Sequence, residues 1–216
     1  MIGLECSCSR STIPTNKAVI CRIIPKKRNE SLTLISSNSI RAHYEGCWTE
    51  KSESTQWQLG PMQQLVPEFT TLRFPPTRNR KMWTYATCGM SSQADAPPIE
   101  LHLFSPFQTE SHVELLTAIA YYHMTGAYLD LGHTVNFGRA WLPESKCMHG
   151  LISLPYLDGP KLEWLSENGQ KVRFLWLLPI TDEELKFKLA HGLDALEDNF
   201  QNRPFDYVNP SRPSVV

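Results

Sequence analysis

The chain has 216 residues, of which 41% are hydrophobic and 20% are charged. This length suffices for one large domain or two small ones with a core of their own, without disulfides or a metal. The 21 lysines and arginines nearly balance the 22 aspartates and glutamates, and a net charge of −1 argues against electrostatic capture of nucleic acid or of an anionic membrane. The longest nearly pure apolar run, 174–180, is far shorter than the roughly 20 residues of a membrane-spanning helix.

The first 36 residues differ in composition from the rest of the chain. They are rich in Ser, Thr, Asn and Lys, contain one basic cluster at 26–28, and hold at most a short strand at 32–35. We therefore expect 1–36 to be a weakly ordered N-terminal extension and 37–216 to be the folded domain. The start of the chain lacks the apolar core of a secretory signal, so we expect a cytoplasmic protein whose six cysteines are reduced.

Five later segments have the composition of β-strands. The segment 82–88 is rich in β-forming residues, and the apolar residues of 99–103 alternate with polar ones as in a half-buried strand. We also expect strands at 133–137 and 151–157. The nearly continuous apolar segment 172–178 predicts a central strand that is covered on both faces.

Two helices are predicted from their start signals. Ser111 and Glu114 have the spacing of a capping box, and this helix would end at Gly126. Thr181 and Glu184 have the same spacing before a second helix, whose acidic first turn we expect to stabilise its terminus rather than to catalyse. A stripe of apolar residues predicts the buried face of this second helix: Leu185, Leu189, Leu193, Leu196 and Phe200.

The order of strands, helix, strands, helix departs from the regular alternation of a doubly wound fold. We therefore predict an α+β domain in which helices pack against a mixed or antiparallel β-sheet. No internal repeat or low-complexity tract divides the chain further.

A zinc-stabilised scaffold is one alternative function. His43 and Cys47 are four residues apart, Cys147 and His149 are two apart, and together they would supply four ligands of the types that zinc accepts. This spacing matches no recognised finger, and Cys and His more often simply pack in a core. We therefore expect no metal and no other cofactor.

A Cys/His-dependent hydrolase or transferase is the second alternative. Cys88 ends a predicted strand and precedes Gly89, a geometry that can expose a nucleophile, and His133 with Asn136 would complete a Cys–His–Asn arrangement. However, the chain has no GxSxG elbow, no HExxH helix and no glycine-rich phosphate loop. We therefore expect a protein that is not an enzyme.

Tryptophan and tyrosine side chains are the candidates for partner binding. They are enriched at binding hot spots, because each combines a large apolar surface with one polar group. Among them we take Trp83, Tyr85 and Trp141 as the candidate partner-binding residues.

Several sequence strings together resemble the suppressor of fused family in its bacterial stand-alone form. The resemblance covers about residues 37–216, and the first 36 residues have no counterpart. The strings are IRAHYEGCW at 40–48, WTYATCGMS at 83–91, ELHLF at 100–104, LGHTVNFG at 131–138, LISLPY at 151–156, FLWLLPIT at 174–181, and the ending from AHGLD at 190–194 to PSVV at 213–216.

This resemblance implies a fold like the N-terminal domain of suppressor of fused, and protein binding rather than catalysis. The animal protein clamps an extended peptide of a transcription factor between two domains, partly by strand addition. This chain ends shortly after its second predicted helix, so we expect the second lobe of the clamp to be absent. Bacterial relatives resemble immunity proteins, which implies that the protein partner is a toxin domain that the chain binds and blocks.

Overall fold

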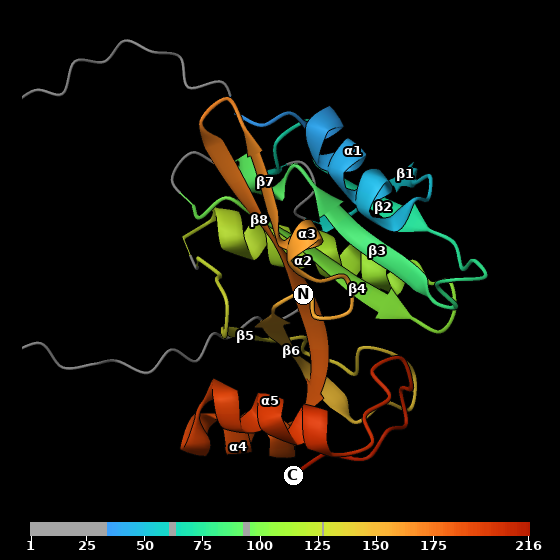
Figure 1. Cartoon of the computed structure of the whole chain (residues 1–216), viewed down its shortest axis with the longest axis vertical. Coiled ribbons are helices and arrows are strands. Elements are labelled where there is room, and N and C mark those ends of the chain that lie inside the picture. The colour runs from blue at the N-terminus through green and yellow to red at the C-terminus, as the bar shows by residue number, and fades with distance from the viewer. Residues whose placement is uncertain (1–33, 61–63, 93–95, 127) are drawn as a thin grey trace, which may run out of the picture.

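The computed structural model describes residues 34–60, 64–92, 96–126 and 128–216, and within them the strands form one eight-stranded sheet (Figure 1). The strand order is β1-β2-β3-β4-β8-β6-β5, and β7 pairs with β8 beside this path. The strands are β1 Glu53–Thr55, β2 Thr70–Phe74, β3 Trp83–Cys88, β4 Ile99–Ser105, β5 Thr134–Asn136, β6 Cys147–Ser153, β7 Trp164–Glu167 and β8 Gln170–Thr181. The helices are α1 Ser37–Trp48, α2 Ser111–Met124, α3 Pro160–Glu163, α4 Asp182–His191 and α5 Leu193–Asn202, with a short 3-10 turn at Met90–Ser92.

The sheet is mixed, as predicted. Strands β4 and β8 run parallel, with His102 opposite Trp176, and the other strand pairs of the described residues are antiparallel. Helices pack against this sheet, so the predicted α+β class is confirmed.

Strand β8 lies inside the sheet and is covered on both faces, because successive side chains of a strand point to opposite sides. Leu175 and Leu177 point to the face that α2 covers, where they join a core that includes Val113 and Leu116. Phe174 and Trp176 point to the opposite face. The continuous apolar segment thus forms the predicted central strand.

The face opposite α2 carries two separate groups of helices. Helices α1 and α3 cover one part, where Tyr44 packs edge-on against Phe174 with ring centroids 4.8 Å apart. Helices α4 and α5 lie together at the end of β8, and Leu196 of α5 packs with Trp176 and Leu178 (Figure 1). The segment that follows α5 completes this second group.

The second predicted helix is in fact two helices. Gly192, with φ 91° and ψ 172°, separates α4 from α5 in a conformation that side-chain-bearing residues rarely adopt. The capping box of Thr181 and Glu184 is present. The prediction of one continuous buried stripe was wrong, because the break turns α5 relative to α4. Leu196 of α5 is fully buried, whereas Leu189 of α4 is 54% exposed.

The capping box predicted for α2 was also wrong. The chain enters this helix one residue earlier, so Glu110 occupies the cap position and Ser111 is already helical. The backbone N–H of Ser111 donates to Thr109 Oγ1 at 3.2 Å. The helix ends at Met124, two residues before the predicted stop at Gly126.

Most predicted strands are present, with shifted bounds. The segments 82–88, 99–103, 133–137 and 172–178 correspond to β3, β4, β5 and β8, but the predicted 151–157 matches only the second half of β6. The strand predicted at 32–35 is wrong at residues 34 and 35, which have no regular structure. Residues 32 and 33 lie outside the described part of the chain. Three strands were not predicted: β1, β2 and β7.

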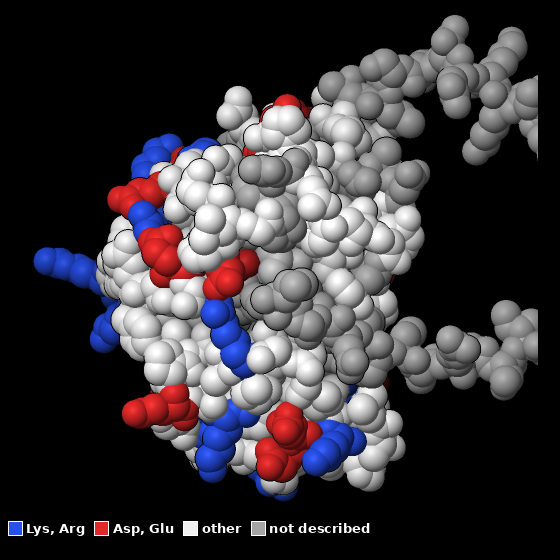
Figure 2. Space-filling view, turned by 180° about the vertical axis from the view of Figure 1, so that it is seen from behind, with Lys and Arg blue, Asp and Glu red and all other residues white. Residues whose placement is uncertain are grey.

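The surface opposite to that in Figure 1 carries both signs of charge. Lysines and arginines lie among aspartates and glutamates in small groups, and uncharged residues cover much of this face (Figure 2). Within the described part of the chain, no helix is both long enough and apolar enough to cross a membrane.

Candidate functional site

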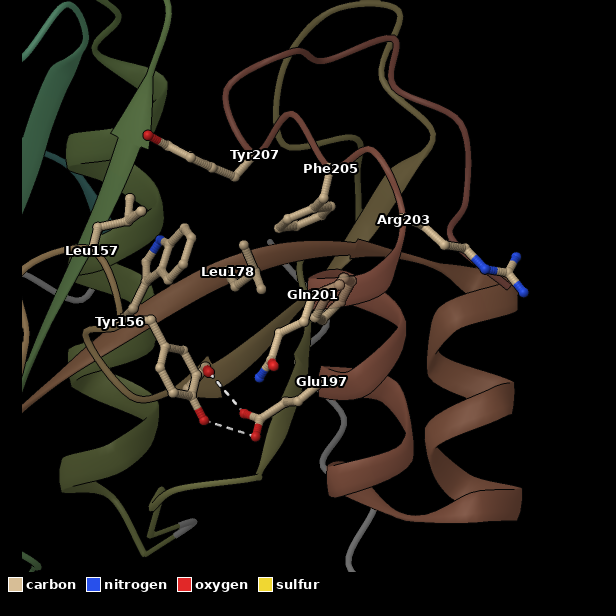
Figure 3. A pocket seen from close by; sticks show the side chains of 11 residues that line it. Tyr156, Leu157, Leu178, Glu197, Gln201, Arg203, Phe205 and Tyr207 are labelled. Carbon is tan, nitrogen blue, oxygen red and sulfur yellow. Dashed lines mark hydrogen bonds between the residues drawn. The ribbon is translucent and has the colours of Figure 1, made fainter.

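A cavity of about 410 Å³ opens between the sheet, α5 and the segment that follows α5 (Figure 3). Trp176 and Leu178 of β8 form its floor, together with Ser153 of β6. Alternation along β8 places both apolar side chains on this face, opposite the core beneath α2. The cavity therefore lies on the face of the sheet that α5 and the segment after it cover together.

The walls of the cavity come from two parts of the chain. Helix α5 contributes Glu197 and Phe200, and the following segment contributes Phe205 and Tyr207. The aromatic rings contact one another: Phe200 and Phe205 have centroids 4.4 Å apart, and Tyr207 stands edge-on to Trp176 at 5.3 Å. Five of the eleven lining residues are therefore aromatic.

The segment after α5 is held in place by a buried ion pair. Arg212 Nη1 lies 2.6 Å from Glu184 Oε1, and Arg212 Nη2 donates to Glu184 Oε2 at 2.7 Å and to the Pro179 carbonyl at 2.9 Å. The backbone N–H of Val215 also donates to Glu184 Oε1, at 3.1 Å. Glu184 therefore both caps α4 and anchors the segment that forms one wall.

Two exposed side chains lie at the mouth of the cavity. Tyr156 and Leu157 follow β6, line the cavity, and are 51% and 46% exposed. Large apolar groups at a concave site, left partly open to water, are typical of binding surfaces.

One carboxylate is oriented inside this aromatic lining. Glu197 accepts a hydrogen bond from Ser153 Oγ at 3.1 Å and another from the Tyr156 hydroxyl at 2.8 Å (Figure 3). Burial, followed by the neighbouring Glu197 carboxylate, raises the pKa of Tyr156 to about 12. Both donors are therefore neutral at pH 7, and they orient the carboxylate without neutralising it.

Trp176 has an unused hydrogen-bond donor. Its Nε1–H is buried and has no partner in the structure, although buried indole N–H groups usually find one. A mostly apolar cavity with a few placed polar groups is the usual form of a ligand-binding site.

The three predicted partner-binding residues lie elsewhere. Tyr85 and Trp141 are buried on the α2 side of the sheet, where His112 lies between them at centroid distances of 5.2 and 5.5 Å. Trp83, at the start of β3, is partly exposed. None of the three lines the cavity, and Tyr85 and Trp141 present almost no surface to a partner in this conformation.

The proposed arrangement of Cys88 and His133 is wrong. Cys88 is fully buried under α1, where its thiol donates to the Ser37 carbonyl at 3.2 Å. Burial, followed by the charge of Glu100, raises the pKa of this thiol to about 12, so the nucleophilic thiolate is scarce at pH 7. His133 adjoins β5, four strand positions from β3, and steps of about 4.8 Å place the two strands roughly 19 Å apart.

The four predicted zinc ligands do not converge either. His43 and Cys47 both face backbone carbonyls at α3: His43 Nε2 lies 2.9 Å from Leu162 O, and Cys47 donates to Lys161 O at 3.6 Å. His149 pairs with Asp182 at 2.7 Å near the start of α4. Among the described residues, no three His, Cys, Asp or Glu side chains are grouped to hold a metal.

Comparison with known proteins identifies one family. The family model described as "Suppressor of fused protein (SUFU)" matches residues 66–213, more than half of the chain. The "Immunity protein YqcF" of Bacillus subtilis is 23% identical over 142 residues, which are 62% of this chain and 74% of YqcF.

Solved structures agree with this family. A suppressor of fused homologue from Neisseria gonorrhoeae is 33% identical, with a TM-score of 0.74 over 83% of this chain and 96% of that chain. The Sufu–Fu complex matches with a TM-score of 0.63 at 15% identity, over 83% of this chain and 92% of that chain. Drosophila Suppressor of Fused matches with a TM-score of 0.60 at 15% identity, over 82% of this chain and 50% of that chain. The last two show the fold alone, and the fold predicted from the resemblance is confirmed.

Proposed function

The chain belongs to the suppressor of fused family, and we propose that it is a non-enzymatic protein-binding module that acts as an immunity protein, binding a toxin domain and blocking it. The likeness to Immunity protein YqcF, which extends over 74% of YqcF, is the observation that supports this most directly. We propose that it acts in the bacterial cytoplasm. The toxin domain is its protein partner in this proposal.

The side-chain chemistry supports binding rather than catalysis. Cys88, the candidate nucleophile, is sealed from solvent and its pKa is raised to about 12. The cavity beside α5 offers aromatic surface and a single oriented carboxylate, which suits the recognition of a side chain.

The cavity supplies only part of such an interface. Nanomolar binding corresponds to about −12 kcal/mol, and stable protein complexes typically bury about 1,600 Å². We therefore propose that the cavity anchors one side chain of the partner, while the exposed Tyr156 and Leu157 extend the contact around its mouth.

Coexpression with a candidate toxin domain, such as one found encoded next to the gene of this chain, tests this function. The full chain should restore growth of a bacterium that expresses the toxin domain, and the two purified proteins should form a complex by calorimetry. A binding protein inhibits stoichiometrically. Protection should therefore be lost once the molar amount of the toxin domain exceeds that of the chain.

Two outcomes would contradict the proposal. Protection by far less chain than toxin would indicate an enzyme that inactivates the toxin. Absence of both protection and complex formation would exclude the immunity function. Cys88→Ala serves as the matched variant, since a binding protein should retain full protection without this thiol.

A further inference from the structure

We propose that the cavity beside α5 binds an arginine side chain of the protein partner. This inference rests on the proposed function, because it takes the ligand to be a protein. It is carried by three features that meet in one cavity: aromatic faces, an oriented carboxylate, and a volume larger than one side chain.

The aromatic lining favours a cation over a neutral group. Trp176 and Tyr207 stand edge-on at 5.3 Å, and Phe205 packs beside Phe200, so several ring surfaces converge on the cavity. A cation within about 6 Å of a ring centroid is attracted by the negative face of the ring, and a guanidinium also stacks on it. The protein itself uses this contact next to the cavity, where Arg212 lies over Phe205 at 4.7 Å.

The carboxylate of Glu197 supplies the opposite charge. Each of its oxygens accepts one hydrogen bond from a neutral hydroxyl, Oε1 from Ser153 and Oε2 from Tyr156. Each oxygen keeps further acceptor capacity, and a guanidinium has the paired donors to use both. Lysine has a single charged centre and cannot form this fork.

The charges around the cavity are compatible with a bound cation. Asp194 acts on Tyr156 in the same direction as Glu197, which places further negative charge near the mouth. Glu163 acts in this direction too, but it is paired with Arg173 at 2.8 Å. Arg203 lines the rim, but its guanidinium points away from Glu197 (Figure 3). Two further cations lie near the cavity, and both are already paired: Arg212 with Glu184, and Arg80, which acts on Tyr207, with Asp158 at 2.5 Å.

The volume of about 410 Å³ also fits this ligand. The three-carbon stem of an arginine can lie on Trp176 and Leu178 while its charged end reaches Glu197. The remaining space would accommodate an apolar neighbour on the partner's chain. Such a side chain would exclude water from the carboxylate and strengthen the charge interaction.

Three blocked pentapeptides test the proposal with the full chain. They are acetyl-Gly-Leu-Arg-Leu-Gly-amide and the same peptide with lysine or with citrulline, which keeps the shape of arginine but carries no charge. Binding is followed by NMR at the indole N–H of Trp176. The arginine peptide should shift this resonance saturably, with at least tenfold tighter binding than the citrulline peptide and tighter binding than the lysine peptide.

Two variants locate the interaction. Glu197→Gln should bring the arginine and citrulline peptides to within about twofold of each other, whereas Glu167→Gln, on the exposed strand β7, should leave the tenfold difference unchanged. The comparison of peptides on the unaltered chain does not depend on whether a variant folds.

Each of three results would contradict the arginine site. The arginine and citrulline peptides could bind equally, the lysine peptide could bind more tightly than the arginine peptide, or no peptide could give a saturable shift up to its solubility limit. If growth protection against the toxin domain persisted in that case, only this inference would fail and the immunity function would stand. If protection also failed, the proposed function would be excluded by that separate measurement.

Discussion

Arg212 and Glu184 form a buried ion pair between the C-terminal segment and the first turn of α4, with Nη1 2.6 Å from Oε1 and side chains only 4% and 0% exposed. The pair holds Phe205 and Tyr207 over β8, and so determines one wall of the cavity. It is also costly to break, because either partner alone would be an uncompensated buried charge.

Replacing Arg212 should therefore destabilise the protein strongly. Arg212→Met should lower the free energy of unfolding by about 3–5 kcal/mol, since it leaves Glu184 charged and buried. Urea denaturation measures this change. The exposed Arg203→Met is the control and should remain within about 0.5 kcal/mol of the unaltered chain. Equally small losses in both variants would mean that the pair does not stabilise the fold.

The two C-terminal helices should respond differently to loss of a leucine. Leu196→Ala in α5 should cost about 2–5 kcal/mol, because the side chain is fully buried and its removal leaves a cavity. Leu189→Ala in α4 should change stability by less than about 0.5 kcal/mol, because that side chain is 54% exposed. Denaturation of both variants checks this, and similar losses would contradict the break at Gly192.

His112 should make stability depend on pH. Burial, followed by the charge of Arg139, lowers its pKa to about 3, so it stays neutral in the folded protein while the unfolded chain takes up a proton below about pH 6.5. Stability is therefore complete above pH 6.5 and falls as the pH decreases toward 3. From pH 8 to pH 5, the unaltered chain should lose about 2 kcal/mol more than His112→Phe.

The variant His112→Phe isolates this effect. It keeps an aromatic ring beside Trp141, which stacks on His112 at 5.5 Å, while the other buried histidines remain in both proteins. Unfolding curves recorded at several pH values give the comparison. Parallel pH profiles for the two proteins would show that His112 does not titrate as expected.

The three described cysteines should differ in reactivity. Cys88 is fully buried with its pKa raised to about 12, and burial also raises the pKa of Cys147. Burial raises the pKa of Cys47 as well, but this thiol is only partly buried and so remains accessible to a reagent. Iodoacetamide at pH 7.5, followed by mass spectrometry of each cysteine peptide, should modify Cys47 in the native protein and Cys88 only after denaturation. Rapid native modification of Cys88 would reopen the enzymatic alternative.

Two glycines should have opposite responses to alanine. A Cβ on Gly150 in β6 would lie 2.6 Å from Leu177 Cδ1 and 2.6 Å from the Phe137 ring, so Gly150→Ala should cost about 1–3 kcal/mol. Gly46 lies in α1 with nothing within 4 Å of the added carbon. Gly46→Ala should stabilise the protein by about 0.4–1 kcal/mol. Denaturation measures both, and a loss at Gly46 would contradict the free space there.

Local signals in the sequence predicted several elements correctly. Strand β8 was recognisable because a strand covered on both faces needs apolar residues at nearly every position. The start of α4 was recognisable because the Thr181–Glu184 capping box depends only on residues three apart. Helix α1 was not predicted, although its buried residues Ile40, Tyr44 and Trp48 have helical spacing.

The cavity could not be predicted in the same way. Its walls depend on a contact between Arg212 and Glu184, which are 28 residues apart in the sequence, and Phe205 and Tyr207 lie in an irregular segment without periodicity. The three aromatic residues chosen from composition include Tyr85 and Trp141, which the α2 side of the sheet buries. Composition identifies aromatic side chains but not the face of the sheet on which they lie.

The irregular segment after α5 also offers a way to detect whether a partner occupies the cavity, through its sensitivity to a protease. Chymotrypsin cuts after aromatic residues, and Phe205 and Tyr207 are aromatic, partly exposed and outside regular structure. A bound partner would cover both cleavage positions at once. Protection of these two peptide bonds would thus report the filled state in crude cell extract, without any label on the protein.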